Sequence, residues 1–114
     1  MDSILNTIKL QLGIEADYNH FDHQIIVHIN AALMTLSQLG VGPSTPFIVI
    51  NEMDTWEKAF GELPNIEAVK LYISLKVRML FDPPTSSFVL DAMNRQVTEL
   101  EWRLHVGSTE TKEG

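Results

Sequence analysis

The chain has 114 residues, no cysteine and a formal net charge of −7. This length predicts a single domain with one core, and the lack of cysteine excludes disulfides, a thiolate nucleophile and a thiolate zinc site. Residues 1–69 hold nine acids against two lysines, whereas six acids balance six bases in residues 70–114. The first part of the chain would therefore repel DNA, which argues against a duplex-binding protein.

Two helices are predicted in the first third of the chain. Ser3–Leu12 places its apolar residues on one face, and Gly13 is positioned to end it. A polar connector follows. A longer helix is expected to begin at Phe21 or Asp22 and to run to Leu39, where Gly40 ends it.

Residues 41–54 are expected to form a loop, because glycines and prolines punctuate its first part. Within it, Phe47, Ile48, Val49 and Ile50 form a run that favours extended backbone and is too short for a helix. A lone strand cannot satisfy its own backbone groups. The run therefore either packs as an extended segment within the fold or pairs with a neighbouring subunit.

A short helix is predicted after the loop, with Asp54 as its N-cap and Glu57 as the partner in a capping box. The next helix, Ile66–Phe81, is apolar over most of its circumference. It is therefore expected to be the central helix, with Asn65 as its N-cap. Two prolines, at positions 83 and 84, end it.

The last predicted helix is Ser86–Leu104, with one apolar stripe and two acid–base pairs at i, i+4 on its other side: Asp91–Arg95 and Glu99–Arg103. Together these elements predict an all-α fold, a small bundle of four to five helices. Residues 1–106 would form the helical domain and residues 107–114 a flexible C-terminal tail. We expect no secretory leader, and no apolar run is long enough to cross a membrane.

Residues with catalytic or metal-binding chemistry are sparse. If helical, His20 and His23 would share a face near Asp17, but two imidazoles and one carboxylate fall short of a zinc ligand set. Glu52, Asp54 and Glu57 lack the glycine and the oxygen spacing of a calcium loop. No nucleophile, base and oxyanion element come together, so we expect neither an enzyme nor a cofactor.

Trp102 lies off the apolar stripe, near the end of the last predicted helix, and is followed by Arg103 and His105. Two interpretations remain open. The ring either covers a helix junction or anchors a partner protein, since Trp and Arg are enriched at binding hot spots.

Four segments carry a resemblance to a known family: Gln38–Pro43, Thr55-Trp56, Phe81–Ser87 and Glu99–Leu104. In this order and spacing they resemble the head–tail connector (head-completion adaptor) proteins, small virion proteins of tailed phages and prophages of Gram-positive bacteria. The similarity covers about residues 4–106, and the run Phe81–Ser87 is its most specific piece.

The resemblance implies a structural protein that is assembled in the host cytoplasm and located at the head–tail junction of the virion. About twelve copies would form a ring under the portal protein. DNA would only pass through the channel that the ring extends, and a stopper or tail-completion protein would bind its other side; no membrane is involved. We expect Phe47–Ile50 at a subunit or stopper contact, and Trp102, Arg103 and His105 with the tail near the portal.

Three other functions stay open at this point: a DNA-packaging factor similar to a small terminase subunit, a metal-dependent enzyme at His20 and His23, and another tail-completion protein. The first requires a basic face, for which few lysines and arginines are available.

Overall fold

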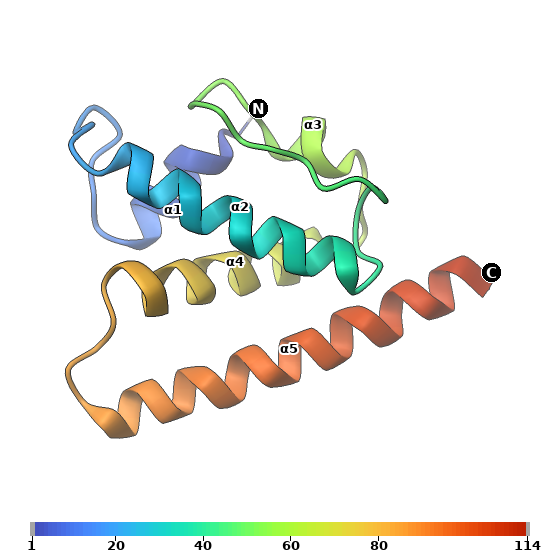
Figure 1. Cartoon of the computed structure of the whole chain (residues 1–114). Coiled ribbons are helices and arrows are strands. Elements are labelled where there is room, and N and C mark those ends of the chain that lie inside the picture. Colours follow the sequence, from blue (N-terminus) through green and yellow to red (C-terminus); the bar gives the residue numbers. More distant parts are fainter. Residues whose placement is uncertain (1, 114) are drawn as a thin grey trace.

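The computed structural model describes the backbone of residues 2–113 and the side chains of residues 2–107. Within this part the chain forms five helices and no strand longer than one isolated bridge (Figure 1). The helices are α1 (Ile4–Gln11), α2 (Asp22–Gln38), α3 (Trp56–Phe60), α4 (Ile66–Phe81) and α5 (Ser87–Glu113). The all-α prediction is confirmed.

Helix α4 is the centre of the fold, as its wide apolar arc predicts. It lies between α2 and α5 and also packs against α1 (Figure 1). Val69, Tyr72, Ile73 and Val77 of α4 are completely buried. Each such side chain contributes about 1.5–3 kcal/mol of burial free energy. Leu80, which lies on the same predicted stripe, is 55% exposed because it is near the end of α4.

The N-terminal part is fastened by a buried ion pair. The Lys9 ammonium, completely buried, lies 2.8 Å from Asp22 Oδ1 and donates a hydrogen bond to the Ala16 carbonyl. One side chain thus joins α1, the connector and the start of α2. Ser3 caps α1 by accepting from the Asn6 amide.

Two predicted N-caps differ from the structure. Thr55 caps α3 by accepting from the Lys58 amide, because Asp54 Oδ2 already accepts from the amides of Ile50 and Asn51. The residue before α4 is Asn65, as expected, but its side chain makes no capping hydrogen bond. Residue-type patterns located both helix starts and misassigned the hydrogen bonds.

The corner between α4 and α5 follows the proline prediction: α4 ends at Phe81, and Ser86 Oγ accepts from the Val89 amide. The buried side of α5 is centred on Val97 and Leu104. The helix continues to Glu113, beyond the Leu104 end expected from the sequence. The expected end was the last residue of the apolar stripe, whereas the helical backbone continues after the stripe has ended. That residues 107–114 are flexible stays a prediction.

Candidate interaction surfaces

The segment 47–50 packs within the fold, and one side chain replaces the strand partner that it lacks. Asn30 of α2 donates from Nδ2 to the Val49 carbonyl at 3.1 Å, and its Oδ1 accepts from the Val49 amide at 2.8 Å. The Val49 side chain is 1% exposed, and Phe47 packs against the core. In the single chain, therefore, this run packs as an extended segment within the fold.

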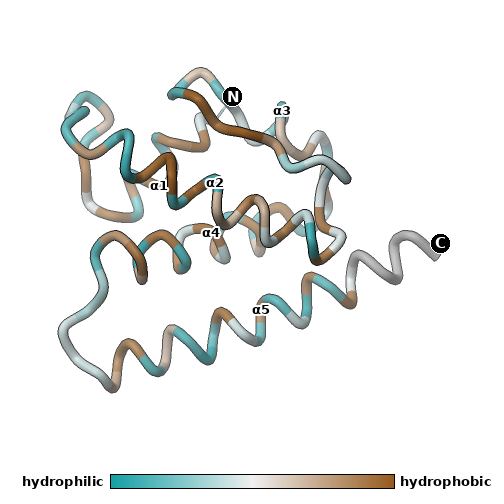
Figure 2. Tube along the Cα trace, in the orientation of Figure 1, coloured by the Kyte–Doolittle hydropathy of each residue, from teal (hydrophilic) through white to brown (hydrophobic). Residues whose placement is uncertain are grey.

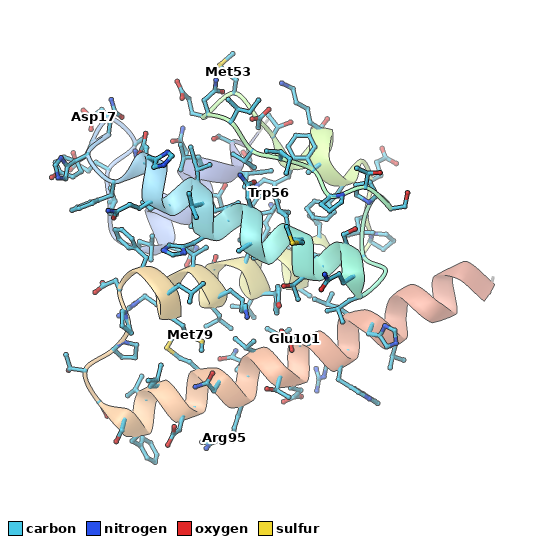
Figure 3. The ribbon with its side chains drawn as sticks, in the orientation of Figure 1. Asp17, Met53, Trp56, Met79, Arg95 and Glu101 are labelled. Atoms are coloured by element: carbon cyan, nitrogen blue, oxygen red, sulfur yellow. The ribbon has the colours of Figure 1, made fainter. Side chains whose placement is uncertain are left out.

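The alternate residues of the same segment face solvent. Ile48, Ile50 and Met53 are 55%, 73% and 68% exposed; we call these three residues the loop surface. Figure 2 shows the hydrophobic segment crossing the outside of the molecule above α2, and Figure 3 places Met53 at its outer edge. The Asp54 carboxylate accepts hydrogen bonds from the amides of Ile50 and Asn51, and these bonds fix the backbone of the turn that carries this apolar surface.

A second exposed surface lies on α5. Phe88, Arg95 and Trp102 follow one another at intervals of seven residues, so they lie on one face of the helix. That face points away from α4, since Val97 and Leu104 occupy the opposite side. Phe88 is 77% exposed and Trp102 66%. We call these three residues the α5 outer face.

The sequence left open whether the Trp102 ring covers a helix junction or anchors a partner protein, and its exposure in the isolated chain bears on this choice. A ring that is 66% exposed does not cover a helix junction. Its role as an anchor for a partner stays a prediction.

Two residues next to Trp102, Arg103 and His105, make contacts within the chain. Arg103 pairs with Glu99 on the surface of α5, as predicted, whereas the structure has no ion pair between Asp91 and Arg95 within the described residues. His105 Nδ1 lies 3.0 Å from the Leu39 carbonyl at the end of α2. The carbonyl only accepts, so Nδ1 carries the proton, and His105 fastens α5 to α2.

A buried polar contact between α4 and α5 was not predicted. The Tyr72 hydroxyl, in a completely buried residue, donates to Glu101 Oε2 at 2.7 Å. Burial, followed by the hydrogen bond to Glu101 and the charge of that carboxylate, raises the pKa of Tyr72 well above its ordinary value; a hydrogen bond with Thr35 opposes this. A tyrosine at a core position with a glutamate on the facing helix is the only sequence signal for such a pair.

Sequence reasoning also missed an acidic cleft of about 480 Å³ between α3 and the start of α4. Trp56, only 4% exposed, forms part of its floor, and its Nε1–H donates to Thr7 Oγ1. The Lys70 ammonium lies 5.6 Å from the centre of the Trp56 ring. The lining residues are Asp2, Trp56, Glu57, Gly61, Glu62, Leu63, Pro64, Ile66 and Lys70.

The histidine cluster considered for a metal is arranged differently. Asp22 is used by Lys9, and the His20 ring packs edge-on against Phe21 with their centres 4.8 Å apart. Within the described residues, no three histidines or carboxylates converge as a metal site would require. Over the same residues, no helix has the length and apolar character needed to span a membrane.

These features define a class of protein: a small helical domain that carries, among its exposed apolar residues, two surfaces on different sides, as in a component of a larger assembly. Residues 4–111 match the family model described as phage connector protein, and the chain belongs to this family. Neither the curated proteins nor the solved structures contain a match. The family identifies the chain as a structural component of the virion, at the connection between head and tail, that interacts with other virion proteins.

Proposed function

We propose that this chain is a head–tail adaptor that forms a closed ring of about twelve copies beneath the portal protein. The ring extends the channel through which DNA passes and joins the capsid to a stopper or tail-completion protein. The protein acts by binding alone and catalyses no reaction.

The observation that carries this proposal is a connector-family chain with apolar surfaces on two opposite sides. Figure 3 places Met53, on the loop surface, and Arg95, on the α5 outer face, at opposite edges of the molecule. A chain with two such separate surfaces can bind two different neighbours at once, and head-to-tail contacts between identical copies close into a ring when the rotation between subunits permits it.

The charge distribution also supports a DNA channel. Among the described residues, most acids of the first 69 residues are exposed, whereas Asp22 and Asp54 are used inside the fold. Side chains of the same charge as the DNA backbone weaken its attachment to a channel wall. On α5, acids and bases alternate, as in Asp91, Arg95, Glu99 and Arg103. This pattern does not provide the basic face of a packaging factor.

We assign the portal contact to the C-terminal end of the chain and the stopper contact to the loop surface. The test is deletion of residues 108–114, which keeps His105 and its contact with Leu39. Purified truncated protein should unfold at the same temperature as the full chain, and phage particles made with it should contain less of the protein on their heads. Heads completed normally with the truncated chain would contradict this assignment.

The matched control replaces Ile50 and Met53 by Ser in the full-length chain. These changes should leave binding to heads intact and prevent tail attachment, which electron microscopy of the particles shows directly.

A further inference from the structure

The acidic cleft is suited to a cationic and aromatic group. Its rim carries three exposed carboxylates, those of Asp2, Glu57 and Glu62, against the single ammonium of Lys70. Its floor is apolar and held in place, because the Trp56 ring is buried and hydrogen-bonded to Thr7. The Lys70 ammonium, which pairs with Glu67 at 3.4 Å, lies 5.6 Å from the centre of that ring, so the ring already has a cation near it.

The α5 outer face presents such a group. Trp102 and Arg95 lie two turns apart on one face of α5, with Asn94, Thr98 and Glu99 around the ring. Residues that are exposed, aromatic and accompanied by arginine are typical anchors of protein interfaces. Trp102 contributes little to the core of its own chain because most of its ring is in solvent.

The two features cannot meet within one chain. Figure 3 places Trp56 and Arg95 on opposite sides of α4, and the α5 outer face points away from α4. A second copy, in contrast, can present its α5 outer face to the cleft. The carboxylates at the cleft and the Arg95 guanidinium two turns from an exposed indole are opposite in charge, and their union is a head-to-tail contact.

We propose that Trp102 and Arg95 of one subunit occupy the acidic cleft of the next subunit in the ring. The indole lies on the apolar floor beside Trp56, and the guanidinium lies among the carboxylates of Glu57 and Glu62. This inference rests on the proposed ring and names the residues of its subunit contact. The contact leaves the loop surface free for another virion protein.

Cross-linking of introduced cysteines tests the contact, because the natural chain has none. The variant Thr98→Cys/Asp2→Cys places one thiol beside Trp102 and one at the cleft, and it keeps Glu57 and Glu62. Phage particles made with it are treated with a short bifunctional maleimide and analysed on a denaturing gel. We expect a ladder of linked subunits. Each single variant should give no dimer, and a mixture of the two single variants should give dimers only.

The matched control is Thr98→Cys/Asp17→Cys, which moves the second thiol to another exposed acid, at the far end of the molecule from α3 (Figure 3). It should give no ladder. Dimers from Thr98→Cys alone would show that two α5 helices meet, and a product with the mass of one subunit plus another virion protein would show a different occupant. Either result overturns the inference.

The amount of the chain in the particles separates this inference from the proposed function. If particles contain the chain but give no ladder, the subunit contact is wrong and the adaptor function stands. If particles lack the unmodified chain, the adaptor function fails, and the inference fails with it.

A charge exchange gives an independent readout. Arg95→Glu should reduce incorporation of the chain into particles at least 10-fold, and Arg95→Glu/Glu62→Arg should restore most of it. Both variants should melt at the temperature of the natural chain, because both positions are exposed. Failure of the second change to restore incorporation would contradict the pairing.

Discussion

The side chain of Asn30 makes both backbone hydrogen bonds that Val49 would make in a sheet. A helix residue thereby acts as the partner strand for one residue of a loop 19 positions away. This arrangement keeps the backbone of a buried residue satisfied, and it turns Ile48 and Ile50 outward.

The substitution Asn30→Ala should therefore destabilise the protein by about 2 kcal/mol, because it leaves a buried amide and a buried carbonyl without partners. Urea unfolding followed by circular dichroism measures the change. Asn19→Ala, at an exposed loop position, serves as the control and should change the stability by less than about 0.5 kcal/mol. Equal effects of the two substitutions would mean that the Asn30 contact contributes nothing.

Because of Tyr72, the free energy of unfolding should decrease at alkaline pH. Its pKa is raised in the folded state, so above pH 10, its ordinary pKa, the unfolded chain releases the hydroxyl proton while the folded chain retains it. Stability due to this group is therefore fully present below pH 10 and decreases as the pH rises above it. Tyr72→Phe should show a smaller decrease than the natural chain when unfolding is measured from pH 9 to pH 11.

Removal of one partner of the Lys9–Asp22 ion pair should lower the free energy of unfolding strongly, whereas replacement of both partners by apolar residues should lower it little. Lys9→Met leaves the Asp22 carboxylate without its cation and should cost about 3 kcal/mol. The double variant Lys9→Met/Asp22→Leu removes both charges and should recover most of this loss. Thermal unfolding of the natural chain, Lys9→Met, Asp22→Leu and the double variant forms a double-mutant cycle, and strictly additive effects would rule out coupling.

Gly42 is required for two reasons, which a matched pair of substitutions separates. Its φ of 84° is in the left-handed region, and a Cβ at this position would lie 2.8 Å from Phe60 Cε1. Gly13 has a φ of 78° and open space around it. Both Gly→Ala variants should lose about 1 kcal/mol from the backbone conformation. Gly42→Ala should lose more, and an equal loss in urea unfolding would exclude a steric contribution from Phe60.

The two tryptophans should report on different events. Trp56 is buried and Trp102 exposed, so Trp102→Phe should leave a chain that fluoresces as a buried indole and unfolds at an unchanged temperature. Trp56→Phe should instead lower the unfolding temperature and leave an emission typical of an indole in water. In this second variant, a shift of the emission to shorter wavelength on assembly would mark the burial of Trp102.

The sequence predicts the helices of this protein better than its polar contacts. Ile66–Phe81 is correct to the residue, because its apolar arc and the following prolines are local signals. The contacts of Asn30 and Tyr72 join residues 19 and 29 positions apart, and no local pattern encodes such distances. Asp54 was assigned to the wrong hydrogen bonds because capping a helix and binding the amides of a turn require the same residue type.

Which residues contact a partner stays a prediction, and the structure shows only how exposed those residues are. The segment 47–50 and Trp102 were selected as contact residues, and the structure leaves Ile48, Ile50 and the Trp102 ring exposed. Val49 is instead a core residue, and His105 binds the end of α2. The acidic cleft was missed because it is formed by residues from three separate segments, and no local pattern shows that these segments lie side by side.

The position of α5 has a consequence for the order in which the protein opens. This helix packs mainly on α4, whereas α4 also contacts α1 and α2. Loss of α5 alone therefore leaves the remaining helices together, so amides in α5 should exchange with deuterium before those of α4. Contacts of α5 with neighbouring subunits would slow that exchange, so the helix would open less often in the particle than in the isolated chain.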